Sequence, residues 1–197
     1  MSFLANNCSL RLLNQSILDE CDAFDCGHKD LNEFFSKDCI YYTKDLFGKT
    51  YCFTFDSDPK KIVCAFTLAN DSIKAMSLQK STRNKISRPI SNPKRFHNYP
   101  AVLIGRLGVN KAFKRNGIGK ELMDSLKAWF IDEENKTGCR FIIVDSYNEK
   151  IPLTFYKNNG FKNIFKSEEE EKEYLSLQTE DSLKTRLLYF DLIKLTK

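Results

Sequence analysis

The sequence predicts an α/β fold in which one mixed sheet is covered by helices. Segments rich in β-branched and aromatic residues alternate along the chain with segments of helical apolar spacing. The chain has 197 residues, of which 42% are apolar, and this is ample for a packed core. We see no internal repeat and no linker, and therefore expect a single domain spanning residues 1–197.

A helix and a hairpin are expected in the first part of the chain, after an irregular opening. Asp30 followed by Glu33 resembles a capping box, which predicts a helix over about 31–42. Residues 50–55, TYCFTF, and 61–69, KIVCAFTLA, are rich in strand-forming residues and are separated by the turn-like DSDPK. These two segments therefore predict an antiparallel hairpin.

Strands and helices then alternate to the end of the chain. AVLIGRLGV (101–109) is an apolar strand with Arg106 as its only charge, and helical spacing follows from near 117 to the polar run DEENKTG. RFIIVD (140–145) predicts a strand, and IPLTFYKNNGF predicts a short helix between Pro152 and Gly160. TRLLYFDLIKL predicts the last strand.

Positive charge is concentrated in residues 71–100, which hold seven basic residues and one acid. This segment should be helical at first and broken by its prolines. An exposed cluster of this kind attracts polyanions, although a solvated helix face followed by a loop is an equal alternative. The candidate substrate contacts within it are Arg83, Lys85 and Arg88. The acidic residues 167–181 are expected to form a mostly solvent-exposed segment.

Cysteine usage and hydropathy limit the class of protein. The seven cysteines contain no CxxC pair, and there are only two histidines, so we expect reduced thiols, no disulfide scaffold and no metal site. No run of 18 apolar residues occurs, and the start lacks the features of a signal peptide. The sequence therefore predicts a cytoplasmic protein without a membrane segment.

The stretch KRNGIGKEL (114–122) links the apolar strand to the amphipathic helix. It is not a Walker loop, because Glu121 follows Lys120 and no glycine stands five positions before Gly119. It is not a dinucleotide fingerprint either, because Leu122 occupies the third glycine position. Two interpretations remain from the residues alone: a helix start that holds an anionic pyrophosphate, and a plain strand-to-helix connection.

Taken together, GRLGV, KRNGIG, the amphipathic helix, FIIVD and FYKNNGF resemble the GNAT superfamily of acetyl-CoA-dependent N-acetyltransferases. The turn signature of that superfamily is Gln or Arg, two residues, Gly, any residue, then Gly or Ala, and here the first position is Lys114. FDCGHKDLNEFF and AFTLANDSI are similar to the branch that contains toxin acetyltransferases acting on aminoacyl-tRNA. The resemblance implies a GNAT-like splayed, mostly antiparallel sheet flanked by helices.

The resemblance also implies how acetyl-CoA would bind. Main-chain N–H groups of the strand would bond the pantetheine amides and the thioester carbonyl. The residues assigned to this role are Leu107, Gly108 and Val109. The pyrophosphate would be held by the turn, at Lys114, Arg115, Asn116, Gly117, Ile118, Gly119 and Lys120.

Two more residues receive roles from the resemblance. Tyr156 matches the tyrosine whose hydroxyl protonates the leaving thiolate, although an adjacent Phe–Tyr pair is by itself more often core packing. Asn148 resembles the asparagine that contacts the pantetheine arm, but it lies seven positions before Phe155 where six is usual. A surface turn asparagine is the alternative for Asn148. No general base is assigned.

The predicted function is therefore acetyl transfer from acetyl-CoA to a primary amine by direct attack in a ternary complex. The acceptor suggested by the similar branch is the α-amine of aminoacyl-tRNA. The alternatives are a small-molecule or protein amine, or a nucleic-acid-binding module of GNAT fold without catalysis. A homodimer and an antitoxin partner are compatible with the resemblance.

Overall fold

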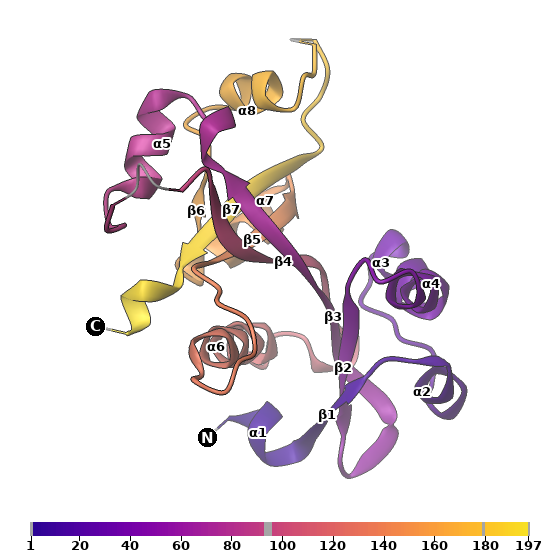
Figure 1. The fold of residues 1–197 in the computed structure, drawn as a ribbon. Helices are drawn as coiled ribbons and strands as arrows, with labels where there is room; N and C mark the ends of the chain where they lie inside the picture. The colour runs from indigo at the N-terminus through magenta and orange to yellow at the C-terminus, as the bar shows by residue number, and fades with distance from the viewer. Residues whose placement is uncertain (1, 93–95, 179, 197) are drawn as a thin grey trace. The chain divides into compact units, whose positions relative to one another are not determined.

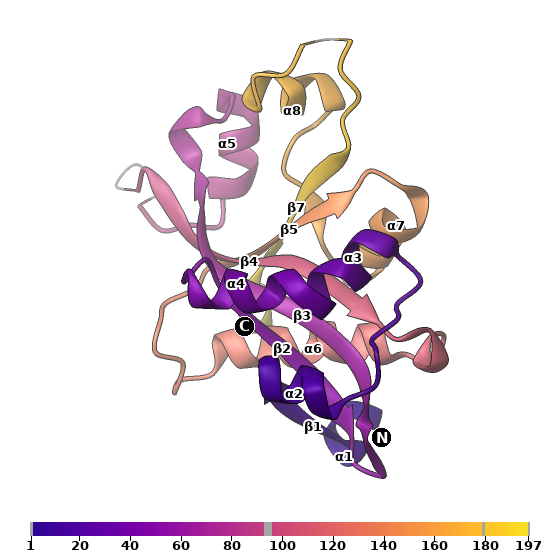
Figure 2. The same cartoon turned by 90° about the vertical axis from the view of Figure 1, so that its right-hand side faces the viewer.

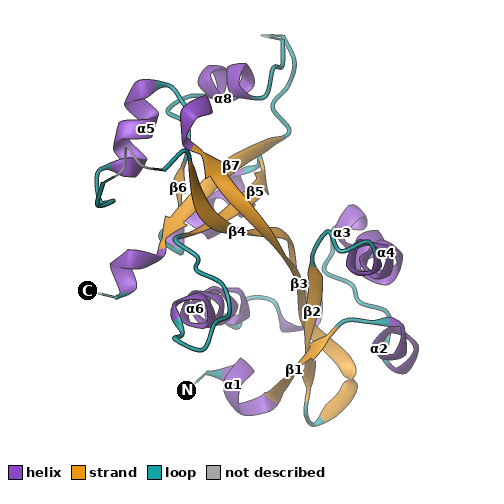
Figure 3. Cartoon of the chain, in the orientation of Figure 1, coloured by secondary structure: helices purple, strands orange, loops and turns teal. Residues whose placement is uncertain are grey.

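A computed structural model of the chain describes residues 2–92, 96–178 and 180–196. Seven strands form one sheet in the order β1-β2-β3-β4-β5-β7-β6, flanked by helices (Figure 3). The strands are β1 Cys8–Leu12, β2 Lys49–Phe55, β3 Asp58–Lys74, β4 Asn98–Val109, β5 Phe141–Tyr147, β6 Lys162–Asn163 and β7 Thr185–Asp191. The α-helices are α1 Phe3–Asn7, α2 Gln15–Glu20, α3 Lys29–Glu33, α4 Cys39–Lys44, α5 Lys80–Ser87, α6 Ile118–Ile131, α7 Lys150–Asn158 and α8 Glu168–Tyr174. The predicted α/β class is confirmed.

The chain divides into two compact units. The first contains Met1–Ala69 and Ile104–Trp129, and the second contains Asn70–Leu103 and Phe130–Lys197. No feature of the sequence predicts this division, and one domain over 1–197 stays a prediction. The antiparallel pairings β1–β2, β2–β3, β5–β7 and β6–β7 account for most of the sheet.

In the first unit, helices α2, α3 and α4 cover one face of strands β1–β3, and α6 lies on the other face (Figures 1 and 2). The expected hairpin is confirmed as β2 and β3, with Asp58 already in the second strand. The expected irregular opening was wrong, because it contains α1, the edge strand β1 and α2. A strand of five residues with an exposed Leu10 does not give a strong alternating pattern.

The predicted helix over 31–42 is present as a continuous run from α3 to α4. A π-helical stretch, Phe34–Asp38, interrupts it. The capping-box interpretation was wrong, because the helix begins two residues earlier, at Lys29, and His28 occupies the N-cap without a side-chain cap bond. Phe34 and Phe35 are both buried, and they anchor the run in an apolar cluster with α2, β2 and β3.

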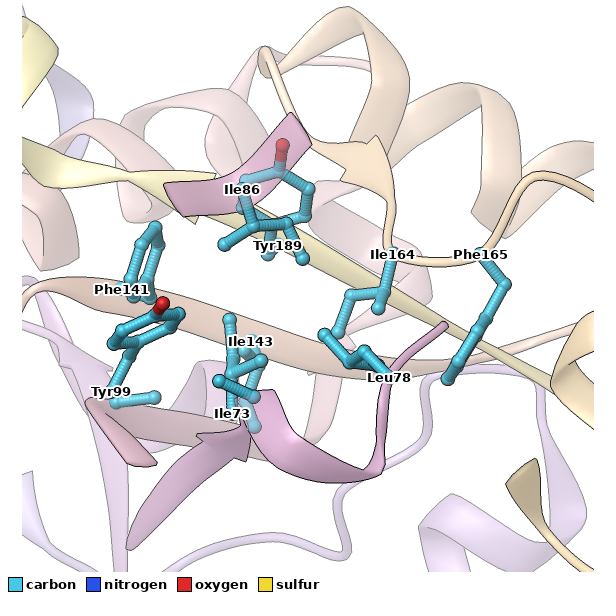
Figure 4. Close-up of a cluster of buried hydrophobic side chains, with 11 residues drawn as sticks. Ile73, Leu78, Ile86, Tyr99, Phe141, Ile143, Ile164, Phe165 and Tyr189 are labelled. Carbon is cyan, nitrogen blue, oxygen red and sulfur yellow. The ribbon is translucent and has the colours of Figure 1, made fainter. Parts of the chain in front are cut away.

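In the second unit, α5 and α8 cover the face of β5 and β7 that carries Phe141, Ile143 and Tyr189. Figure 4 shows these side chains interdigitating with residues from the turn before α5 and from the segment after β6. A cavity of about 150 Å³ lies against this cluster, bordered by Ile73 and Leu78. The apolar pattern of RFIIVD (140–145) predicted a strand, which is confirmed as β5, Phe141–Tyr147.

The acidic segment 167–181 is mostly exposed among its described residues, as predicted, but two glutamates of helix α8 are buried. The Glu171 carboxylate is fully buried and accepts hydrogen bonds from Arg186 Nε at 2.6 Å and from the main-chain N–H of Leu187 at 2.5 Å. Glu170 is also buried and accepts a hydrogen bond from the Thr82 hydroxyl at 2.5 Å. Acidic side chains therefore join α8 to β7 and to α5.

The seven cysteines are free thiols in this structure, and four of them are buried. Burial raises the pKa of the Cys139 thiol, which opposes a role as nucleophile. Within residues 2–92, 96–178 and 180–196, no group of three or more His, Cys, Asp or Glu side chains could hold a metal ion. The same described residues include no helix that is long and apolar enough to cross a membrane.

Candidate active site

The turn after β4 is anchored to β3 at its first residue. The main-chain N–H of Asn110 donates to the carbonyl of Val63 at 2.9 Å, and its side-chain Nδ2 donates to the carbonyl of Ile62 at 3.0 Å. The Asn110 Oδ1 accepts from the N–H of Ala112 at 3.0 Å and starts a single 3-10 turn, Lys111–Phe113. These three hydrogen bonds fix the point from which the glycine turn begins.

The glycine turn itself adopts backbone angles that favour glycine. Gly117 has φ of 78° and Arg115 has φ of 66°, both in the left-handed region. Nothing lies within 4 Å of a Cβ built on Gly117, so its backbone angle, and not lack of space, requires glycine. Helix α6 begins at Ile118, and the first N–H groups of a helix have no partner within it. Such a turn suits an anionic phosphate.

Asp25 clamps the loop that contains FDCG onto this turn. The Asp25 carboxylate forms an ion pair with Lys111 Nζ at 2.5 Å, and it accepts 2.8 Å hydrogen bonds from the Gly27 N–H and from Asn32 Nδ2. The Asp25 carbonyl also accepts the Lys111 N–H at 2.9 Å. The Lys111 ammonium, followed by the other two donors, lowers the pKa of Asp25 to about 2.

The basic side chains of the turn differ in whether an acidic side chain pairs with them. Lys120 pairs with Asp124 at 2.5 Å. Lys114 and Arg115 are exposed, and neither forms an ion pair with any residue that the structure describes. The electrostatics of the turn therefore favour an anion at the residues assigned to the pyrophosphate.

The strand segment assigned to the pantetheine is packed closely on one side. A Cβ on Gly108 would lie 3.1 Å from both Cys26 Cβ and Phe24 Cε1, so only glycine fits there without a shift. Gly108 is buried, whereas Leu107 and Val109 on either side of it are half-buried. The FDCG motif thus supports the strand and the turn together, a role that sequence analysis missed because the motif lies more than 80 positions before them.

Tyr156 is buried among aromatic rings on α7. Its ring centroid lies 5.1 Å from that of Phe155 and 5.5 Å from that of Phe161. Burial raises the pKa of the Tyr156 hydroxyl, which keeps it protonated at neutral pH. Gly160, with φ of 84°, ends the helix where a Cβ would lie 3.0 Å from Phe190. The FYKNNGF motif therefore builds an enclosed, protonated hydroxyl.

Asn148 links the end of β5 to the segments before β7. Its Nδ2 donates to Glu168 Oε1 at 3.1 Å and to the carbonyl of Leu183 at 3.0 Å, and its N–H donates to Lys184 at 2.9 Å. Glu168 also pairs with Arg186 at 3.3 Å. The amide nitrogen of Asn148 is thus held by the protein, which leaves its oxygen as the atom for a pantetheine contact.

The three basic residues proposed for substrate binding lie on or next to α5. Arg88 is exposed, Arg83 is half-buried near the sulfur of Met76, and Lys85 Nζ donates to the carbonyl of Asn163 at 3.0 Å. Partial burial, and then repulsion from Lys162, lowers the pKa of Lys85, and Lys166 adds to the repulsion. Lys162 and Lys166 therefore extend the basic surface. Lys94 and Arg95 lie outside the described residues.

Residues 88–163 match the acetyltransferase (GNAT) domain model. Among solved structures, a tyrosine-to-phenylalanine mutant of KacT is similar to this chain at a TM-score of 0.69 and 18% identity, covering 97% of this chain and 98% of KacT. AtaT complexed with acetyl-methionyl-tRNAfMet gives 0.65 and 19%, covering 96% and 98%. A mutant AtaT toxin bound to acetyl-CoA and the C-terminus of the antitoxin AtaR gives 0.59 and 18%, covering 96% of each chain.

Proposed function

We propose that the chain is an N-acetyltransferase that takes its acetyl group from acetyl-CoA and gives it to the α-amine of aminoacyl-tRNA. The match of residues 88–163 to the acetyltransferase (GNAT) domain model and the similarity of the fold to KacT and AtaT support this proposal. The observation that carries the proposal is the glycine turn at the start of α6. Its left-handed Arg115 and Gly117, and its unpaired Lys114, create a site for a pyrophosphate.

The proposed binding of acetyl-CoA uses main-chain atoms more than side chains. The turn from Lys114 to Lys120 binds the pyrophosphate, and the strand from Leu107 to Val109 bonds the pantetheine and the thioester carbonyl. The Asn148 oxygen contacts the pantetheine arm. The acetyl-CoA in the AtaT complex supports this cosubstrate. Lys114 stands where the superfamily signature has Gln or Arg. This difference is tolerable because the protein groups that bind the pyrophosphate are mainly main-chain N–H donors.

In the proposed chemistry, the neutral amine attacks the thioester carbon in a ternary complex. A new C–N bond forms, the C–S bond breaks, and the amine loses one proton to solvent. Tyr156 donates its hydroxyl proton to the leaving sulfur and is then reprotonated by water. An α-amine has a pKa of about 7.7 to 8.0, so a useful fraction is neutral without a general base.

The proposed acceptor rests on charge and on one similar complex. Arg83, Lys85 and Arg88 give α5 a basic character that Lys162 extends, and such surfaces attract phosphates. The acetyl-methionyl-tRNAfMet complex of AtaT supports the same acceptor class. This acceptor would place the protein in the cytoplasm. The antitoxin AtaR in the complex with AtaT supports an antitoxin as a partner of this chain too. The proposal of a homodimer rests on the resemblance alone.

The decisive experiment is an acetyl-transfer assay with labelled acetyl-CoA on bulk aminoacyl-tRNA, beside a panel of small amines and proteins. We expect the label in tRNA, and binding that weakens with salt at a log–log slope of roughly −0.7 to −0.9 per phosphate contacted. Reversing Arg83, Lys85 and Arg88 to Glu should abolish transfer to tRNA while the thermal shift with acetyl-CoA survives. Equal and negligible tRNA binding by wild type and the triple variant would remove the tRNA acceptor and leave the acetyltransferase function standing.

A further inference from the structure

Arg106 is the only charged residue of β4, and aromatic rings hold its side chain in place. The guanidinium carbon lies 3.8 Å from the centroid of the Phe34 ring and 6.0 Å from that of Tyr42. The main-chain N–H of Arg106 donates to the Thr67 hydroxyl at 2.9 Å. The guanidinium carbon therefore lies over the Phe34 ring, within the distance of a cation–π contact.

Arg106 is half-buried and has no anionic partner in the part of the chain that the structure describes, because the ion pairs there all use other residues. A guanidinium carries five N–H donors in a planar fork, and stacking leaves the edge of that fork unused. Removing part of it from water without an acceptor is unfavourable. Its partner is thus expected to be a ligand with paired oxygen atoms, such as a phosphate or a carboxylate.

The position of Arg106 separates it from the pyrophosphate turn. Val109, where β4 ends, is three positions after Arg106, or roughly 10 Å along the strand. The adjacent residues Leu107–Val109 are those proposed to bind the pantetheine and the thioester. An oxyanion on Arg106 would therefore lie nearer to the reacting groups than to the pyrophosphate.

We propose that Arg106 is an acceptor-binding residue whose guanidinium, held on Phe34, binds an oxyanion of the acceptor. The proposal rests on the proposed function, in which that oxyanion is a phosphodiester of the tRNA 3′ end. A small amine acceptor would present the same chemistry as a carboxylate. The side chains of α5 bind the tRNA from another element, and Arg106 acts next to the amine that is acetylated.

The test compares Arg106→Gln, Arg106→Lys and the matched control Arg11→Gln, whose arginine is also in the first unit and pairs with Glu20. Arg106→Gln should raise the KM for aminoacyl-tRNA about 10- to 100-fold, as expected for a lost charged hydrogen bond, and leave the KM for acetyl-CoA within about twofold. The salt slope for tRNA should fall by about 0.7. Arg106→Lys keeps the charge but not the flat fork, and should lie between these limits.

The possible results separate this inference from the proposed function. An unchanged KM for tRNA, or an equal rise in both KM values, would overturn the role of Arg106. If the wild type acetylates only small amines, the tRNA acceptor fails, and the same variants are assayed on an amino acid and on its amide. The inference would then be supported if the wild type prefers the amino acid, which has a carboxylate, over its amide and Arg106→Gln abolishes that preference. It would be overturned if the wild type and Arg106→Gln show the same preference. Arg106→Lys serves if Arg106→Gln does not fold.

Discussion

The turn between β4 and α6 and the helix α7 both carry predicted site residues, but different atoms matter in each. In the turn, Lys114 and Gly117 are exposed, and nothing surrounds the position of a Gly117 Cβ. On α7, Tyr156 is enclosed by Phe155 and Phe161. The turn offers main-chain geometry, whereas α7 offers one side-chain oxygen in an apolar setting.

This difference predicts opposite sensitivities to mutation. A site built from main-chain N–H groups should tolerate a changed side chain and fail when its backbone angles are disturbed. A site built from one hydroxyl should fail when a single atom is removed, even if the fold is intact. Three of the four substitution experiments below test this contrast, and one tests the stability of the unit that carries α7; they are given in order of expected effect.

The largest effect should follow removal of the Tyr156 hydroxyl. Tyr156→Phe keeps the ring contacts and should lower kcat by about 10²- to 10⁴-fold, because general acids contribute that much to the transition state. The affinity for acetyl-CoA should be nearly unchanged. Single-turnover kinetics with each variant measures the effect, and Phe155→Leu is the control for packing. An unchanged rate of the chemical step would eliminate Tyr156 as the acid.

The second effect concerns the stability of the unit that carries α7. Glu171→Ala leaves Arg186 buried with only a longer pair to Glu168, and it leaves the N–H of Leu187 without its acceptor. Removing one partner of a buried pair costs about 3 to 5 kcal/mol of unfolding free energy. Urea denaturation measures this loss against the exposed control Glu169→Ala. Equal midpoints for the two variants would show that the network contributes little.

The third effect should separate backbone from side chain in the turn. Gly117→Val forces a β-branched residue into a left-handed angle and should weaken acetyl-CoA binding about tenfold, from a strain of roughly 1 to 2 kcal/mol. Gly117→Asn tolerates this angle and Lys114→Gln leaves it unchanged, so each should have a smaller effect. Calorimetric titration gives the three affinities. A loss at Lys114→Gln as large as at Gly117→Val would reverse the contrast.

The smallest effect should follow Asp25→Asn, which retains the hydrogen bonds to Gly27 but removes the charge that faces Lys111. Because the pair is partly exposed, we expect acetyl-CoA affinity to fall by only about threefold. The control is Asp22→Asn, in the same loop. A loss as large as that of Gly117→Val would mean that the clamp, and not the backbone angle, sets the affinity.

The same residue predicts a pH dependence. The folded pKa of Asp25 is about 2, below its ordinary value of 3.8, so its ion pair stabilises the fold fully above pH 4. That contribution is lost as the pH falls toward 2, where Asp25 becomes protonated in the folded state. An NMR titration of the Asp25 carboxyl carbon should give a midpoint near 2. A midpoint at or above 3.8 would contradict the clamp in solution.

Local patterns predicted the elements that bear the site. The apolar spacing of Ile118, Leu122 and Leu126 predicted α6, and all three are buried. Alternating and apolar runs predicted the hairpin and β5, because strand and helix periods are properties of neighbouring residues. The short strand β1 was missed because five residues carry too few periods to be distinguished from a loop.

Long-range contacts were beyond the reach of such patterns. Glu171 is buried because it contacts Arg186 and Leu187, and α8 has no apolar stripe from which this burial could be predicted. The contact of FDCG with Gly108 and the stacking of Arg106 on Phe34 likewise join segments distant in sequence. The roles of the turn and of Tyr156 came from resemblance to a family, and they remain proposals.

The π-helical stretch Phe34–Asp38 has a consequence for insertions and deletions. Phe34 and Tyr42 are eight positions apart, which in a regular α-helix would place them about 80° apart around the axis. Their rings nevertheless lie 5.7 Å apart, and both approach Arg106. A π-helical turn absorbs one extra residue, so the effective spacing is seven and the rings face the same way to within about 20°. A chain shortened by one residue here would keep that ring pair in an ordinary α-helix, so this position is where relatives of different length are expected to align with a single gap.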